Sequence, residues 1–288
     1  MNGNDGHFWT VGGHFITARG CDDTYIYAND PNKSETPRKQ TITKFKSCLK
    51  QAFIFWPTIK ETAPIEEKKQ DTIIEDKKEE PATRFDINPN GKIIDISKHN
   101  GNIDFKTLKN EVSFVIARVS CGSDKDVKVD EYAKEMIKYR IPFAFYCFSY
   151  AGTVEKAKDE AKKMIAYGKQ YDPLFYIMDA EEPKITTEAI KAFAETLREC
   201  TDTRIGCYVA HNRYKTYKYD TLRDLFDITW IPRYGKNDGT IAGSTRPAYE
   251  CDLWQYTSTG TIAGMDHKVD LNIINGNKTL KWFLTDQN

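Results

Sequence analysis

The stretch Tyr176-Ile177-Met178-Asp179-Ala180-Glu181-Glu182-Pro183 is the most telling part of this chain, because an apolar run ends there in acidic residues and a proline. Asp179 and Glu181 are two positions apart, so on an extended strand their side chains share a face, roughly 7 Å apart along the backbone. Paired carboxylates at this separation can cut a glycosidic bond, since one protonates the leaving oxygen while the other handles the developing positive charge. Acidic residues also follow strands simply as turn formers and helix caps, and the octapeptide alone leaves both interpretations open.

Similar short runs of β-branched and aromatic residues recur on both sides of this octapeptide. Eight strands are predicted, over residues 92–96, 113–119, 142–148, 173–178, 204–210, 227–231, 251–256 and 269–272. Amphipathic helical patterns separate the early ones, for example after Thr153 and Thr186, which are suitable N-caps. Alternating strands and helices imply parallel strands with right-handed crossovers, and eight strands indicate closure into a barrel. After about residue 227 the gaps are too short or too Gly-rich for full helices, so we expect an α/β, irregular TIM-like (β/α) barrel whose last strands lack full helical crossovers.

The composition changes sharply before the barrel. From Glu61 to Glu80 there are eight acidic residues and four lysines, with no aromatic residue. Such a segment buries too little apolar surface to offset its ordering entropy, which predicts a charged, flexible linker over 58–89. The expected domains are therefore a small β-rich piece over 1–57, the linker, and the barrel over 90–288.

Bulk properties exclude several classes of protein. The 42 basic and 42 acidic residues balance, whereas a nucleic-acid binder needs clustered positive charge. No apolar run is long enough to span a bilayer, and the first residues lack the features of a secretory signal peptide. The chain therefore either leaves its cell by another route or is part of a longer one. Seven scattered cysteines without a C-x-x-C pair argue against zinc and against a disulfide framework, so we expect no metal and no cofactor.

In a parallel barrel, functional groups collect where the strands end, because the loops there converge on one mouth. The first predicted strand ends in Asp95, the fourth in Asp179 and Glu181, and the eighth carries Asp270. The intervening strand ends supply aromatic residues, namely Tyr208, Trp230, Trp254 and Tyr256. Four carboxylates and several aromatic rings would thus share one cleft, and such a cleft suits the hydroxyl groups and apolar faces of sugars.

Four ordered motifs carry a family resemblance: Asp95-Ile96-Ser97, Phe175 to Glu181, Trp230-Ile231-Pro232-Arg233-Tyr234, and Trp254-Gln255-Tyr256 followed by Val269-Asp270-Leu271-Asn272. Over about residues 90–288 the chain resembles glycoside hydrolase family 25, the Chalaropsis-type lysozymes. The resemblance implies an N-acetylmuramidase that cuts the β-1,4 bond between N-acetylmuramic acid and N-acetylglucosamine in bacterial peptidoglycan. It also implies action on the cell wall or outside the cell, a bacterial or phage origin, and a monomer.

Carried over by position, the resemblance makes Glu181 the general acid, with Asp179 as the second carboxylate and Asp95 and Asp270 as supporting cleft residues. Whether Asp179 attacks the sugar, orients the substrate's N-acetyl group or activates water stays open, because side-chain rotamers can move the pair between the separations typical of retention and inversion. The four aromatic residues are either sugar-stacking walls or barrel core. Arg118 either forms a structural ion pair with the cleft carboxylates, the favoured interpretation, or contacts the lactyl group of muramic acid.

Residues 1–57 resemble the C-terminal half of a C39-like cysteine peptidase. A glycine pair precedes His14, which would match the catalytic base, and a strand-like run ends in Asp30, which would orient that base. The nucleophile of that family lies upstream of the histidine, yet no cysteine precedes His14 here. We therefore expect a truncated peptidase fragment without its nucleophile. Two alternatives to a muramidase stay open. The barrel could be a wall-binding module whose cleft has lost turnover, or the N-terminal piece could retain residual peptidase activity.

Overall fold

The computed structural model describes residues 17–21, 25–29, 38–41 and 84–285, and the chain divides into a unit over Met1–Glu75 and one over Asp76–Asn288. In the first unit, β1 (Thr17–Cys21), β2 (Tyr25–Asn29) and β3 (Arg38–Thr41) form an antiparallel sheet in the order β1-β2-β3. His14 and Asp30, the expected remnants of a peptidase site, lie outside the described residues. The three domains expected from the sequence stay a prediction.

The second unit is a closed barrel of eight strands. In ring order they are β4 (Lys92–Ile96), β5 (Val112–Cys121), β7 (Phe143–Phe148), β8 (Phe175–Ala180), β9 (Arg204–Val209), β10 (Ile228–Pro232), β11 (Leu253–Gly260) and β12 (Val269–Ile274). The β4–β5 pairing closes the ring, and the two-residue strand β6 (Asp124–Lys125) forms a hairpin with the end of β5. All eight predicted strands are present, so the irregular α/β barrel expected from the sequence is confirmed.

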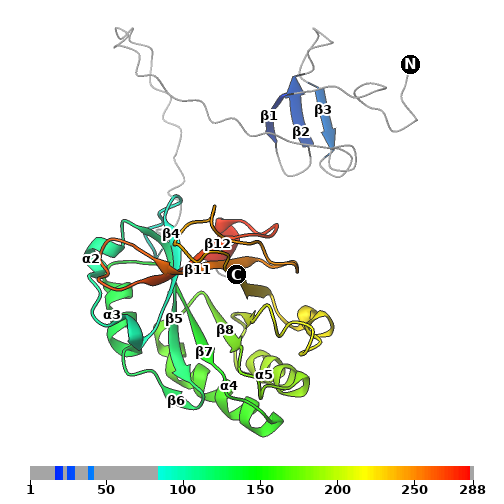
Figure 1. The fold of residues 1–288 in the computed structure, drawn as a ribbon. Helices are drawn as coiled ribbons and strands as arrows, with labels where there is room; N and C mark the ends of the chain where they lie inside the picture. Colours follow the sequence, from blue (N-terminus) through cyan, green and yellow to red (C-terminus); the bar gives the residue numbers. More distant parts are fainter. Residues whose placement is uncertain (1–16, 22–24, 30–37, 42–83, 286–288) are drawn as a thin grey trace. The chain divides into compact units, whose positions relative to one another are not determined.

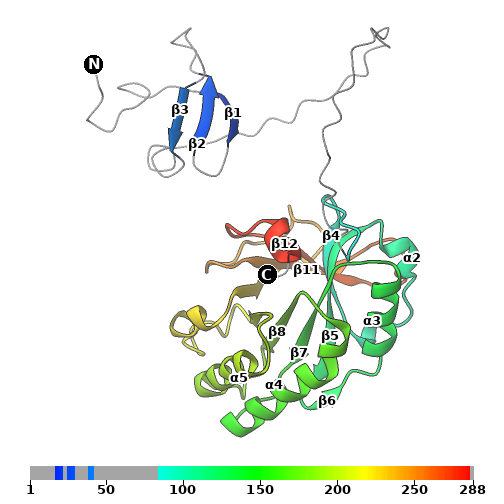
Figure 2. The ribbon, with the colours of Figure 1, turned by 180° about the vertical axis from the view of Figure 1, so that it is seen from behind.

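Helices cover only part of the barrel. The longer ones are α3 (Val129–Lys138), α4 (Val154–Gly168) and α5 (Thr187–Cys200), which pack outside the early strands (Figures 1 and 2). The short ones are α2 (Phe105–Leu108), α6 (Leu280–Leu284) and the 3-10 turns η1 (Lys98–Asn100), η2 (Lys169–Tyr171), η3 (Tyr219–Thr221) and η4 (Arg223–Leu225). As predicted, the last strands lack full helical crossovers. None of the described helices is long and apolar enough to cross a membrane.

Helices α4 and α5 begin at the N-cap residues that the sequence predicted. The Thr153 side chain accepts a hydrogen bond from the backbone N–H of Lys156, and Thr186 does the same for Ala189. Each cap satisfies one of the otherwise unpaired amides at a helix start. These local signals fix where α4 and α5 begin, and therefore how each chain segment returns to the sheet.

One strand departs from the expected parallel arrangement. β12 runs antiparallel to both of its neighbours, β11 and β4. The connection over 261–268 is shorter than the dozen or so residues that a parallel crossover needs. The chain therefore turns directly back, and β12 begins at the barrel end where the parallel strands finish.

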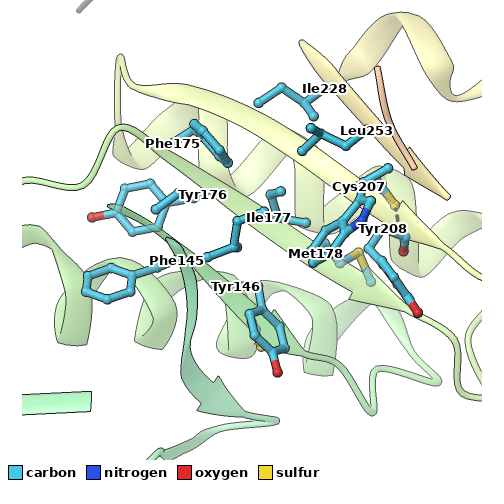
Figure 3. Packing of buried hydrophobic residues seen from close by; sticks show 14 of the residues in the cluster. Phe145, Tyr146, Phe175, Tyr176, Ile177, Met178, Cys207, Tyr208, Ile228 and Leu253 are labelled. Atoms are coloured by element: carbon cyan, nitrogen blue, oxygen red, sulfur yellow. Dashed lines mark hydrogen bonds between the residues drawn. The ribbon is translucent and has the colours of Figure 1, made fainter. Parts of the chain in front are cut away.

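The strand that holds the acidic octapeptide is buried on both faces. Tyr176 packs outward against α4, where a Cβ atom on Gly168 would lie 2.9 Å from the Tyr176 ring. Figure 3 shows Phe145 of the neighbouring strand beside Tyr176 in this layer. A residue larger than glycine at position 168 would push the helix off the sheet. Ile177 alternates to the other face, which also places Asp179 toward the barrel interior.

Part of the segment assigned to the linker packs on the barrel. Phe85 is buried and contacts Phe143 edge to face. The Asp86 amide donates to the Arg140 carbonyl, and the Asp86 carboxylate pairs with the Arg140 guanidinium. Among residues 84–89 the aromatic Phe85 supplies the apolar anchor that the preceding charged stretch lacks.

Candidate active site

The mouth of the barrel gathers the carboxylates from strands that are distant in sequence. Asp95 lies on β4 and Asp179 near the end of β8, and both are buried. Asp270 is the second residue of β12 and stands opposite Asp95 in the antiparallel register. Because β12 runs backward, its beginning meets the carboxyl ends of the parallel strands. Glu181 follows β8 directly and is half-buried.

Two amide side chains hold Asp95. Gln255 Nε2 donates to both carboxylate oxygens of Asp95, at 3.1 and 3.0 Å, and Asn272 Nδ2 donates to Oδ2 at 2.8 Å. All three side chains are buried. A carboxyl group that accepts this many N–H bonds is best satisfied when it is ionised.

The orientation of each amide is set by a second layer of donors. Tyr208 Oη donates to Gln255 Oε1 at 3.0 Å, and Tyr234 Oη donates to the same atom. The indole N–H of Trp230, which can only donate, bonds Asn272 Oδ1 at 2.8 Å. With each amide oxygen occupied in this way, each amide NH₂ group must face Asp95. Hydroxyl and indole groups thus fix the charge state of a carboxylate they do not touch.

Asp95 and Asp270 behave as a pair that shares a proton. Burial raises the pKa of Asp95 to about 6, against the opposing effect of the hydrogen bonds from Asn272 and Gln255. Burial, and then the negative charge of Asp95, raise the pKa of Asp270 to about 8. The two side chains are hydrogen-bonded to each other. Since Asp95 already accepts the amide donors, the shared proton belongs to Asp270.

Asp179 and Glu181 form the second acidic pair. Burial, with the charge of Glu181 next, raises the pKa of Asp179 well above its usual value. Burial, followed by the charges of Glu182 and Asp95, raises the pKa of Glu181. Asp179 Oδ1 is buried without a hydrogen-bond partner among the described residues. Burial and mutual repulsion therefore raise the pKa of both groups, the more accessible Glu181 and the enclosed Asp179, since four converging carboxyl groups are not all ionised at once.

The expected aromatic residues separate into two groups. Tyr208 and Trp230 contact each other edge to face, with ring centroids 4.7 Å apart, and both bond the amides that hold Asp95. Trp254 instead donates its indole N–H to the Arg233 carbonyl and packs on Tyr256. Because Gln255 faces Asp95, its neighbour Trp254 lies on the opposite face of β11. The structure therefore brings Tyr208 and Trp230, but not Trp254, to the carboxylates.

Arg118 makes an ion pair with a carboxylate that the sequence analysis did not single out. Its Nε lies 2.7 Å from Asp126 Oδ2, and both side chains are buried. The Arg118 charge also opposes the rise in the pKa of Asp179. The favoured interpretation of a structural ion pair thus fits, with Asp126 in place of a cleft carboxylate.

Sequence reasoning did not select Gln255, Asn272, Tyr234 or Tyr146 as site residues. Gln255 and Asn272 are amides with apolar or aromatic residues on both sides in their strands, and a buried amide must find hydrogen-bond partners. That signal was available in the sequence. Tyr146 contacts Trp230 edge to face, and burial, followed by the charges of Asp95 and Asp179, raises its pKa. It carried no such signal, because an aromatic residue in the run Phe145-Tyr146-Cys147-Phe148 resembles ordinary core.

The comparisons with known proteins agree on one family. The model of "Glycosyl hydrolases family 25" matches residues 94–265. The solved structure of GHIP, a glycosyl hydrolase 25 of Streptococcus pneumoniae, is 27% identical with a TM-score of 0.62, and the match covers 67% of this chain and 91% of that one. The catalytic domain of endolysin ply40, from bacteriophage P40 of Listeria monocytogenes, is 28% identical with a TM-score of 0.63, and the match covers 68% and 98%.

A bacterial lysozyme from Streptomyces coelicolor shares the fold at 20% identity, with a TM-score of 0.57 and coverage of 67% of this chain and 96% of that one. No curated protein matches the chain.

Proposed function

The chain belongs to glycosyl hydrolases family 25 and is a peptidoglycan muramidase, and from this premise we propose that Glu181 is its general acid. The observation that carries the proposal is the convergence of Glu181, Asp179, Asp95 and Asp270 at one end of the barrel. Glu181 and Asp270 are the two members that are partly exposed and shifted toward their protonated forms. Because Asp270 is engaged with Asp95, Glu181 is the acid left to face the substrate. An acid working near neutral pH requires both properties.

The proposed reaction is hydrolysis of the β-1,4 bond between N-acetylmuramic acid and N-acetylglucosamine. Glu181 gives its proton to the glycosidic oxygen as the bond to the anomeric carbon breaks, and Asp179 serves as the second carboxylate for the positive charge that develops there. Asp95 and Asp270 lie beside them and hold one proton between them. Their negative charge favours the oxocarbenium-like transition state over the neutral substrate.

Among the aromatic residues, the best-supported contribution to binding is from Tyr208, whose hydroxyl reaches the amide that holds Asp95. Trp230 supports the site through Asn272. Trp254 and Tyr256 are proposed as packing residues of the barrel, since burial alone raises the pKa of Tyr256 and no cleft carboxylate contributes. The proposed place of action is the bacterial cell wall, in a bacterium or a phage, with the protein working as a monomer.

The test replaces the acid without changing its shape. We expect Glu181→Gln to slow the clearing of a bacterial wall suspension at least about a hundredfold, because general acid catalysis is lost. Glu188→Gln, an exposed carboxamide substitution on α5, is the matched control and should clear the suspension like the wild type. Equal rates for Glu181→Gln and wild type would refute the role of Glu181.

Mass spectrometry of the released fragments tests the bond that is cut. Muramic acid at the new reducing ends is the expected result, whereas glucosamine there would reassign the bond. A protein that binds walls but releases no new reducing ends would instead be a binding module without turnover.

A further inference from the structure

A hollow of about 380 Å³ lies between the β5–β6 hairpin and the start of α4. Figures 1 and 2 both show β6 next to α4. Its lining includes three basic residues and two exposed apolar ones, namely Lys98, Arg118, Lys156, Val127 and Tyr150. They are contributed by three separate segments of the chain, so the hollow is a feature of the tertiary structure.

Two of the three acidic side chains that line this hollow are already satisfied by the protein, and the third, Asp124, is exposed at its edge. Asp126 Oδ2 accepts from Arg118 Nε at 2.7 Å and from the Lys98 amide, and Asp126 Oδ1 accepts from the Lys128 amide. Glu160 accepts from Ser149 Oγ at 2.6 Å and from the Tyr150 amide, and burial raises its pKa. These carboxyl groups therefore leave little free capacity to neutralise a nearby cation.

The basic side chains are not satisfied to the same degree. Arg118 is 7% exposed, and its Nη2 has no hydrogen-bond partner among residues 84–285. Lys98 and Lys156 are exposed, and neither ammonium group bonds a described residue. A buried guanidinium with an unused N–H group, flanked by two free lysines, is suited to receive a carboxylate.

The rim of the hollow is apolar. Val127 is 79% exposed and Tyr150 is 45% exposed, and both are among the few large hydrophobic residues on the described surface. Exposed apolar side chains beside unpaired donors indicate a binding surface. The matching ligand has carboxylates and small apolar groups close together, as in a short peptide rich in alanine and glutamate.

The strand register relates this hollow to the reacting carboxylates. Cys121, which lines the hollow, stands next to Phe148 on β7, and Phe148 stands next to Asp179 on β8. Two strand spacings separate them, or about 10 Å. A group attached to a sugar that sits over Asp179 can reach across this distance.

We propose that the hollow is a subsite for the peptide stem that muramic acid carries on its lactyl group. A stem carboxylate lies toward Arg118, Lys98 and Lys156, while its methyl groups contact Val127 and Tyr150. The inference rests on the proposed function, since the stem is part of the muramidase substrate. It makes the enzyme selective for glycan that still bears peptides.

The test compares stem-bearing glycan with the same glycan after its peptides have been removed. Wild type is expected to favour the stem-bearing form in kcat/KM, and Lys98→Glu/Lys156→Glu is expected to lower this preference about tenfold, as loss of charge-assisted contacts predicts. Lys162→Glu, on the exposed face of α4 and outside the hollow, is the control for a charge reversal elsewhere on the helix and should keep the wild-type preference. A preference unaffected by the double substitution would overturn the proposal.

A binding experiment separates this proposal from the hydrolysis itself. Calorimetric titration of full-length protein with an L-Ala-γ-D-Glu dipeptide should show binding that the double variant weakens and Lys162→Glu does not. No binding to wild type overturns the subsite even if the glycan is cut. Binding without any release of reducing ends would instead overturn the proposed function and leave the subsite in place.

Discussion

Replacing Asp270 with asparagine should stabilise the protein, by a margin that grows as the pH rises. Asp270 is held against Asp95 with a pKa of about 8, far above that of an aspartate in an unfolded chain. Between the unfolded and folded pKa values, the unfolded chain releases a proton that the folded protein retains. Stability therefore falls as the pH rises through this window. An asparagine at this position would not titrate, and its amide could still donate to Asp95.

The size of this stabilisation follows from the shift in the pKa of Asp270 on folding. An unfolded aspartate has a pKa of about 3.9 and each unit corresponds to about 1.4 kcal/mol, so a shift to about 8 gives an upper limit of about 5 to 6 kcal/mol. Asp270 shares its proton with Asp95 and is partly exposed, so about 2 to 3 kcal/mol is the expected gain near pH 8. For a barrel of this size that gain raises the Tm by about 4–12 °C.

The assay is thermal unfolding of the wild type and of Asp270→Asn at intervals from about pH 4 to about pH 9, which spans both pKa values. The difference in Tm between Asp270→Asn and the wild type should be small at acidic pH, grow steadily and level off above about pH 8. The Asp270→Asn protein should no longer hydrolyse cell walls. Asp202→Asn, an exposed carboxylate before the start of β9 at the opposite end of the barrel, is the control and should give no trend. Parallel curves for wild type and Asp270→Asn would refute the shared proton.

Two further substitutions test the amide network. Gln255→Leu removes the donor to both Asp95 oxygens, so we expect the free energy of unfolding, measured in urea near neutral pH, to fall by about 2–4 kcal/mol. The pKa of Asp95 should rise, so the acidic limb of the pH–rate profile should move to higher pH. An unchanged profile would contradict the role of Gln255. Trp230→Phe keeps an aromatic ring but deletes the N–H that orients Asn272, and should cost about 1–2 kcal/mol and reduce activity without abolishing it. Full activity in Trp230→Phe would show that Asn272 keeps its orientation without the indole.

The sequence by itself determined the strands, the main helices and the acidic residues of the mouth. Alternation, helical periodicity and N-cap chemistry act over a few residues, so the octapeptide at Asp179, the caps Thr153 and Thr186, and the strand that begins at Lys92 could each be predicted locally. Four carboxylates at predicted strand ends also indicated a single cleft.

The tertiary structure alone decided how these groups interact. The reversal of β12 sets Asp270 opposite Asp95, and barrel closure brings Gln255 and Asn272 onto the same carboxylate. These contacts join residues up to 177 positions apart. Register and closure are set by packing around the whole ring, so no local pattern specifies them. For this reason the octapeptide supplies Asp179 and Glu181, whereas the assembled barrel adds Asp95 and Asp270 and shifts the pKa of all four.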